Sequence, residues 1–384
     1  MRRFRTTLLA LLLLPVLALI PALPTPAAAQ PYPQQRRLFR PAAPQPPAQT
    51  LSIDGPVSLG LMTGELNGTF VQIGSDLSVV AASNTLRVVP LLGKGSLQNL
   101  GDLLNLRGVD LALAASDAAV SPEAIKLYPN LRARVGYITK LYDQEIHVLA
   151  GPGIRALEDL ADKVVNADVA GSGTFVTATA MFDALHIPAK LANDTPNAGL
   201  ERLKRGEVAA VVYVIGKPGR LFATVPASAG LHLVPVPVSE AMLQTYVPST
   251  LTHADYPALI AEGDTLETMA VPVLLTAYNW PAGTVRYRNL AAFTDLFFSH
   301  FQDLLQPPYH PKWHDVNLRA TVPGWTREPY AQAWLDRTAA PDAPATTAEE
   351  RSFAAWAAGI GLTNITPAQH AQLLGLWRLR QTPK

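Results

Sequence analysis

The chain has 384 residues, a formal net charge of +1 and only 16% charged residues. It contains no cysteine, which excludes disulfides, thiol nucleophiles, thiolate metal sites and lipid attachment at an N-terminal cysteine. The chain lacks a stripe rich in lysine and arginine, which argues against a nucleic-acid partner. Its length is sufficient for two ordinary domains.

Residues 1–29 have the three-part form of a secretory signal peptide. Three arginines lie within the first five residues, an apolar run covers 8–20, and three alanines precede a cleavage site before Gln30. A membrane anchor is the alternative, but the run is short for a bilayer span and prolines follow it directly. Residues 30–50 are rich in Pro, Gln and Ala and predict a linker. The mature protein is therefore expected to be exported, most simply into a bacterial periplasm.

One pattern of strand, glycine-containing loop and helix occurs twice in the chain. The first copy predicts a buried strand at 86–91, the loop Gly93-Lys94-Gly95-Ser96, a helix at 97–107 and a strand at 109–114. The second copy predicts a strand at 163–169, the loop Gly171-Ser172-Gly173-Thr174 and a helix at 175–185. Such a loop places unpaired backbone N–H groups and a hydroxyl at a helix start, where an anion can bind. The repetition predicts two α/β lobes that face each other across a cleft.

The remaining elements complete this two-lobed expectation. Strands are expected at 57–61, 133–142, 145–150, 208–214, 231–238 and 268–276, and helices at 70–82, 154–161, 200–205 and 287–305. The domain organisation expected from these elements is lobe 1 at 51–150 plus 239–337, lobe 2 at 151–238, and a linker with a short helical appendage at 338–384.

Two motifs resemble cofactor-binding or metal-binding patterns, but the residues within them argue against both interpretations. The stretch 151–156 matches G-x-G-x-x-A, but Pro152 removes a backbone N–H that a pyrophosphate would need. His310 and His314 are four residues apart, as helical metal ligands can be, yet a proline and a tryptophan intervene and no H-E-x-x-H motif is present. A turn is the preferred interpretation of both, and neither a metal nor a cofactor is expected.

Loop hydroxyls and lysines leave two interpretations open. Ser96, Ser116 and Ser172 are not in a G-x-S-x-G motif, and no histidine or acid lies at a catalytic spacing from them. A hydrolase is therefore disfavoured, and each serine is either a helix cap or a ligand contact. Lys94 and Lys217 are either solvated or ligand-binding.

Five motifs occur in the order typical of one family. They are 64–70 (G-x-x-x-G-T-aromatic), 95–100 (G-S-x-x-N-L), 108–117 (G-V-D-x-A-x-x-x-S-D), 171–174 (G-S-G-T) and 216–218 (G-x-P). Over residues 51–335 the chain resembles the TAXI family, the solute-binding proteins of TRAP-type tripartite transporters. Two features depart from that family: Val71 replaces the second aromatic residue after the first Gly-Thr, and the appendage beyond Arg337 has no counterpart.

The resemblance implies a non-enzymatic periplasmic receptor with a type II-like, two-lobed periplasmic-binding-protein fold and no cofactor. Its ligand would be a small carboxylate, namely an amino acid such as glutamate, a dicarboxylate or a keto acid. Its partner would be a membrane permease with a small and a large subunit. A ligand-sensing module for a membrane signalling partner is the alternative. The candidate ligand-binding residues are Asn67, Gly68, Thr69, Phe70, Gly95, Ser96, Asn99, Ser116, Asp117, Ser172, Gly173, Thr174, Gly216, Lys217 and Pro218.

Overall fold

The computed structural model describes residues 55–338 apart from Asn67, and scattered residues between 353 and 377. The expected signal peptide, the linker at 30–50 and most of the expected appendage lie outside the described residues. Within the described part, no helix is long and apolar enough to cross a membrane.

A mixed β-sheet with the strand order β2-β1-β3-β10-β4-β7-β5-β6 organises the chain. Its strands are β1 (Val57–Met62), β2 (Leu86–Leu91), β3 (Val109–Ala115), β4 (Val135–Ala150), β5 (Val164–Asn166), β6 (Lys190–Ala192), β7 (Ala210–Ile215), β8 (His232–Val234), β9 (Val247–Thr252) and β10 (Thr265–Tyr278). At one end β1 pairs in parallel with β2 and β3, and at the other β5 pairs in parallel with β6 and β7. Between them β4 and β10 run antiparallel to each other.

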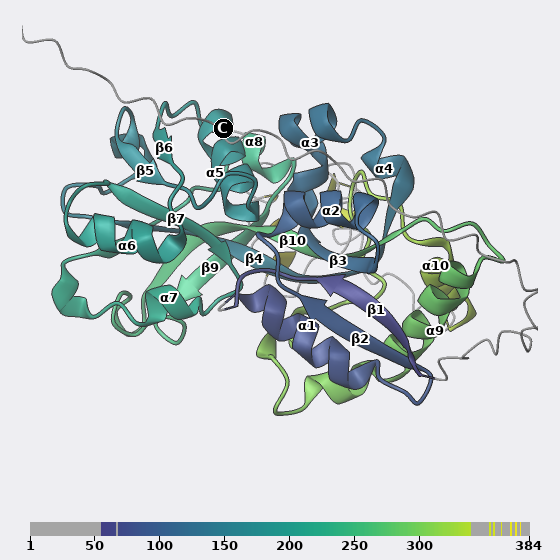
Figure 1. Ribbon diagram of the computed structural model, residues 1–384. Coiled ribbons are helices and arrows are strands. Elements are labelled where there is room, and N and C mark those ends of the chain that lie inside the picture. Colours follow the sequence, from purple (N-terminus) through teal and green to yellow (C-terminus); the bar gives the residue numbers. More distant parts are fainter. Residues whose placement is uncertain are drawn as a thin grey trace, which may run out of the picture. The chain divides into compact units, whose positions relative to one another are not determined.

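Helices accompany both parallel ends of the sheet (Figure 1). They are α1 (Thr69–Val80), α2 (Ser96–Asn105), α3 (Pro122–Leu127), α4 (Leu131–Arg134), α5 (Gly173–Ala184), α6 (Pro196–Lys204), α7 (Arg220–Ala223), α8 (Glu240–Leu243), α9 (Val285–Ser299) and α10 (Pro329–Arg337). We call the part built on β1, β2 and β3 with α1 and α2 lobe 1, and the part built on β5, β6 and β7 with α5 and α6 lobe 2. In Figure 1 the two lobes lie to the right and to the left of β4 and β10.

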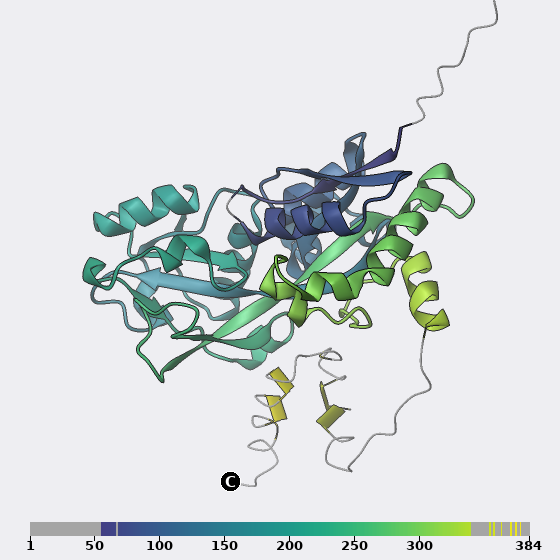
Figure 2. The ribbon, with the colours of Figure 1, turned by 90° about the horizontal axis from the view of Figure 1, so that it is seen from below.

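The two lobes differ in their cores. Helix α9 packs beside α1 in lobe 1 (Figure 2) and contributes Phe293, Phe297 and Phe298 to a cluster that includes the fully buried Trp313. The Trp313 Nε1 donates a hydrogen bond to the α1 carboxylate of Asp76 at 2.8 Å. The main cluster of lobe 2 is largely aliphatic and includes residues of β5, α5 and β7.

Strand β4 differs from the expectation of two strands at 133–142 and 145–150. It is one strand of 16 residues, buried along its whole length. The polar stretch in its middle interrupts the apolar pattern, but the structure pairs its charges: Lys140 with Asp143 at 2.8 Å, and Glu145 with Lys312 at 2.7 Å. One ion pair within the strand and one with Lys312, which is distant in sequence, compensate these buried charges and allow the strand to continue.

Most other elements lie close to their expected positions. β2 has the predicted bounds, and the expected helix at 287–305 ends as an α-helix at Ser299 and continues after one residue as a 3₁₀ turn. The helix expected at 154–161 is a 3₁₀ turn over Leu157–Leu160. The expected α/β architecture with two lobes is confirmed.

Candidate functional site

Three helix starts from the two lobes meet at one cavity of about 60 Å³. The cavity is lined by the starts of α1, α2 and α5 and by parts of β4 and β7. Its lining residues are Gly64, Glu65, Gly68, Thr69, Phe70, Lys94, Gly95, Ser96, Gln144, Asp168, Gly173, Thr174, Tyr213, Val214 and Ile215. The first N–H groups of a helix have no intrahelical partner, so this arrangement directs polar backbone groups and positive partial charge towards one space.

The starts of α2 and α5 approach each other so closely that glycine is required there. A Cβ atom on Gly95 would lie 3.3 Å from the backbone nitrogen of Gly173. A Cβ atom on Gly173 would lie 2.8 Å from the Oγ of Ser96, closer than real Cβ contacts. The two lobes therefore contact each other through main chain and one small hydroxyl at the edge of the cavity.

The hydroxyls at these helix starts hold the helices to neighbouring strands. The Ser96 Oγ accepts a hydrogen bond from the backbone N–H of Ala115 at 2.8 Å. The Thr174 Oγ1 accepts one from the backbone N–H of Val214 at 3.1 Å. Each hydroxyl thus fixes its helix on the adjacent strand, β3 in lobe 1 and β7 in lobe 2.

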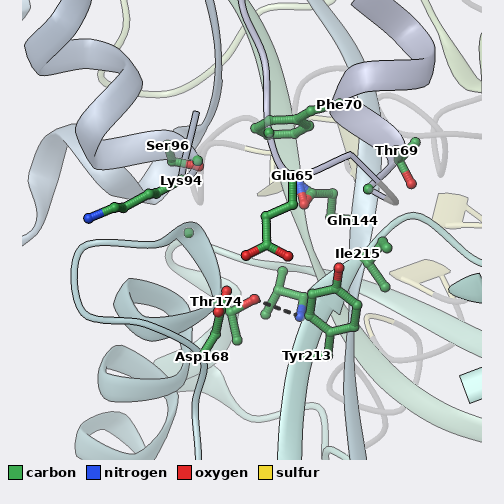
Figure 3. Close-up of a pocket in the computed structure, with 15 residues that line it drawn as sticks. Glu65, Thr69, Phe70, Lys94, Ser96, Gln144, Asp168, Thr174, Tyr213 and Ile215 are labelled. Carbon is green, nitrogen blue, oxygen red and sulfur yellow. Dashed lines mark hydrogen bonds between the residues drawn. The ribbon is translucent and has the colours of Figure 1, made fainter. Parts of the chain in front are cut away.

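The charged groups of the cavity are mainly acidic. Glu65 comes from the loop between β1 and α1, and Asp168 follows β5. Figure 3 shows the Glu65 carboxylate pointing towards Asp168 and Tyr213, whereas the Lys94 ammonium points away from them. Lys94 is also exposed. The charge at the centre of the cavity is therefore negative.

Burial changes the acidity of the groups around the cavity. It is the main cause that raises the pKa of Asp168 to about 6, and the negative charge of Glu65 raises it further. Hydrogen bonds to the Asp168 carboxylate, the first from the Val169 N–H at 2.7 Å, oppose this rise. The pKa of Tyr213 is raised by burial, by Glu65 and by Asp168, so its hydroxyl stays protonated at neutral pH.

The structure places seven of the sequence-predicted residues on the cavity. These are Gly68, Thr69, Phe70, Gly95, Ser96, Gly173 and Thr174. Asn67 lies outside the described residues. The others do not line it: Asn99, Ser116, Asp117, Ser172, Gly216, Lys217 and Pro218.

Several of the seven predicted residues that do not line the cavity form hydrogen bonds or ion pairs elsewhere in the protein. Asn99 is fully buried and its Nδ2 donates to the carbonyl oxygens of Thr63 and Leu113 at 2.6 and 2.7 Å. Ser172 caps α5 by accepting from the Phe175 N–H at 3.1 Å. The Lys217 Nζ lies 3.7 Å from an Asp255 carboxylate oxygen.

Asp117 is buried away from this cavity at a contact between the lobes. It lies in the 3₁₀ turn Ser116–Val120, and its Oδ2 accepts hydrogen bonds from Thr177 of α5 at 2.6 Å and from Tyr246 at 3.1 Å. Burial raises the pKa of Asp117 to about 6. The residue also lines a second cavity of about 410 Å³, between this turn with α3 and helices α5 and α8.

The polar residues that give the cavity its charge are not among the ligand-binding residues predicted from the sequence. Glu65 lies inside the first motif and Asp168 lies three residues before Gly171, so both loops carried a signal. Gln144 and Tyr213 lie within β4 and β7 and had no local signal. Among the described residues, no group of three or more His, Cys, Asp or Glu could hold a metal ion. The His310 Nδ1 accepts from the Lys312 N–H at 3.1 Å in a 3₁₀ turn.

No protein-family model matches the chain. Solved structures similar to it include a TctC solute-binding protein from Polaromonas, at 13% identity over 85% of this chain and 99% of that one, with a TM-score of 0.38. The sulfate-binding protein SubI from Mycobacterium tuberculosis is similar at 11% identity over 75% and 92%, with a TM-score of 0.38. An ancestral arginine-binding protein bound to arginine is similar at 17% identity over 65% and 93%, with a TM-score of 0.37.

Proposed function

We propose that the protein is a periplasmic receptor that captures a small carboxylate and delivers it to a TRAP-type membrane permease with a small and a large subunit. The carboxylate would be an amino acid, a dicarboxylate or a keto acid. The observation that carries the proposal is the meeting of three helix starts, from both lobes, at one cavity. The protein would be exported through a signal peptide at 1–29, with lobes at 51–150 plus 239–337 and at 151–238.

The helix starts supply the binding energy for a carboxylate. Each contributes about 0.3–1 kcal/mol to an exposed anion and more to a partly buried one. A water-excluding cavity strengthens every hydrogen bond made inside it. A micromolar ligand requires about 8 kcal/mol, which these contacts and the burial of the ligand surface can supply together.

Closure of the two lobes would signal that the receptor is occupied. The cavity is lined from both lobes, so a ligand inside it contacts both and favours the closed arrangement. A permease that recognises the closed arrangement then receives only loaded receptors. The polar groups would hold the solute and perform no chemistry on it.

A contact at the C-terminal region favours the alternative of a sensing module for a membrane partner. The Gln369 Nε2 donates a hydrogen bond to the Asp143 carboxylate at 2.9 Å. Asp143 neighbours Gln144, which lines the cavity. Successive side chains of a strand point to opposite faces, so Gln369 contacts β4 on the face opposite the Gln144 side chain. A partner held there would sense occupancy through the strand.

Calorimetric titration of the mature protein with a panel of small organic acids tests the proposal. The Gly173→Ala variant would place a Cβ atom 2.8 Å from the Ser96 Oγ and prevent the close approach of the lobes. Gly151→Ala is the matched control, because its nearest contact would be at 3.7 Å. We expect binding to weaken at least tenfold in Gly173→Ala, which is about 1.4 kcal/mol, and to be unchanged in Gly151→Ala.

Two outcomes would contradict the proposal. The receptor function fails if the wild-type protein binds none of the acids at millimolar concentration. The permease partnership fails if cells that lack the gene take up the bound acid at an unchanged rate, and a changed transcriptional response to that acid would then favour the sensing module.

A further inference from the structure

We infer that the ligand carries a protonated amine, which Glu65 and Asp168 hold between them from opposite lobes. The inference rests on the proposed function and narrows it: of the carboxylates considered there, it selects amino acids and excludes dicarboxylates and keto acids. The ammonium group would lie between the two acids, and the carboxylate would lie at the helix starts.

The two carboxylates of the cavity come from opposite lobes. Glu65 belongs to lobe 1 and Asp168 to lobe 2, and both line the cavity (Figure 3). Closing the lobes therefore brings two negative charges towards each other, which opposes closure unless a positive charge lies between them. Among the described residues that line the cavity, Lys94 has the only ammonium group, and it points away from both carboxylates. A ligand that places a positive charge between the two carboxylates would relieve this repulsion.

Two polar side chains beside the acids make no side-chain hydrogen bond to another described residue. Gln144 is only 7% exposed and lines the cavity. Among the described residues its side-chain amide makes no hydrogen bond, and neither does the Tyr213 hydroxyl. Both groups line the cavity, so their hydrogen-bonding capacity is available to a polar ligand there. The amide carbonyl and the phenol oxygen can both accept a hydrogen bond from an ammonium group.

The size of the cavity and the donor set favour an organic ammonium group over a metal ion. Only two carboxylates line the cavity, and the described residues include no cluster of three potential metal ligands. A volume of about 60 Å³ has room for roughly four to six water-sized groups. A small amino acid, with its carboxylate and amine separated by one carbon, matches both the size and the two opposite electrostatic regions.

Paired ligands that differ only at the amine provide the test. We would titrate the mature protein at neutral pH with L-alanine against pyruvate, and with L-glutamate against 2-oxoglutarate. Calcium chloride alone would serve as the metal probe. The variants Glu65→Gln and Asp168→Asn keep the side-chain shapes and remove the charges. Glu158→Gln and Asp264→Asn are matched controls, because both residues are exposed and lie outside the cavity.

We expect at least one amino acid to bind tenfold or more tightly than its keto acid. Each cavity variant should lower the affinity for that amino acid at least tenfold without lowering the affinity for the keto acid. Each control variant should leave both affinities unchanged. Three results would overturn the inference while leaving a receptor in place: a keto acid that binds as tightly as its partner, cavity variants that bind the amino acid normally, or binding of calcium in preference to all four acids. If the wild-type protein binds none of the acids, the proposed function fails, and the inference fails with it.

Discussion

The starts of α2 and α5 share a glycine followed by a hydroxyl residue, but their backbones differ. Gly95 precedes α2 and has a φ of 112°, whereas Gly173 is the first residue of α5. In the first copy of the motif Gly95-Ser96 opens α2, and in the second Gly173-Thr174 opens α5. Both hydroxyls accept a hydrogen bond from the N–H of the adjacent strand. The shared position is therefore the one that fixes the helix on the sheet.

The neighbouring positions have diverged in what they do. Two residues before each hydroxyl, lobe 1 has the exposed Lys94 and lobe 2 has the helix cap Ser172. Three residues after it, Asn99 connects parts of lobe 1, whereas Thr177 reaches across to Asp117 of lobe 1. A repeated motif therefore predicts where the helices lie, whereas the side-chain contacts around each copy are different.

The largest expected difference is between Asn99→Ala and Thr177→Val. Asn99→Ala removes two buried hydrogen bonds, each costing about 1–3 kcal/mol when a partner stays unpaired, so we expect a loss of roughly 2–6 kcal/mol in the free energy of unfolding. Thr177→Val removes one bond and should cost roughly 1–3 kcal/mol. Urea denaturation measures both. Equal losses would show that the two positions do not differ in the way the contacts indicate.

The burial of Asp117 predicts a dependence of stability on pH, which its hydrogen bond from Thr177 partly opposes. The pKa of Asp117 is about 6 in the folded protein against an ordinary 3.8, so the folded state binds the proton more tightly. The contribution of Asp117 to the free energy of unfolding should therefore be fully present below pH 4 and be lost as the pH rises through 6. Asp117→Asn should remove about 3 kcal/mol of this fall, at about 1.4 kcal/mol for each pKa unit.

Denaturation at pH 4 and pH 7 measures the fall in the wild type and the variant. Asp168 also has a raised pKa, but it is present in both proteins and its contribution cancels in the difference. Parallel pH profiles would contradict the assignment to Asp117.

The shared position should give matched effects in the two lobes. Ser96→Ala and Thr174→Val each leave a backbone N–H of the next strand without its acceptor. We expect each to lower the free energy of unfolding by roughly 1–3 kcal/mol. Thermal denaturation in the absence of ligand measures this loss. A loss of stability in only one of the two variants would contradict the prediction that the two hydroxyls have the same structural role.

The smallest expected effect is at the cap position. Ser172→Ala removes the cap of α5 and should cost about 1 kcal/mol. Lys94→Ala removes an exposed side chain and should change stability by less than about 0.5 kcal/mol. Thermal denaturation of both variants makes the comparison, and an equal loss in the two would contradict it.

The sequence predicted the repeated motif because its signals are local. An apolar strand, a glycine-containing loop and a helical period occur within about 20 residues, so Leu86–Leu91 could be located without knowledge of the rest of the fold. The continuous strand β4 was not predicted, because Lys140, Asp143 and Glu145 are tolerated inside it only through ion pairs, one of them with Lys312.

The candidate site was predicted in its backbone but not in its charge. Glycines and hydroxyls at helix starts follow from loop composition, and the structure places Gly95, Ser96 and Gly173 on the cavity. The proximity of Glu65 and Asp168 depends on how two lobes approach each other. Residues that are distant in sequence and have no shared local motif could not be brought together from the sequence.

The continuity of β4 and β10 limits how the lobes can move. Both strands span the boundary between the lobes, and their pairing shifts register between Pro272 and Leu274 and again between Leu275 and Thr276. A rotation of one lobe must therefore be absorbed as twist along two hydrogen-bonded ribbons, distributed over several residues. We therefore expect the sheet itself to set the axis of opening, in place of a flexible joint between the lobes.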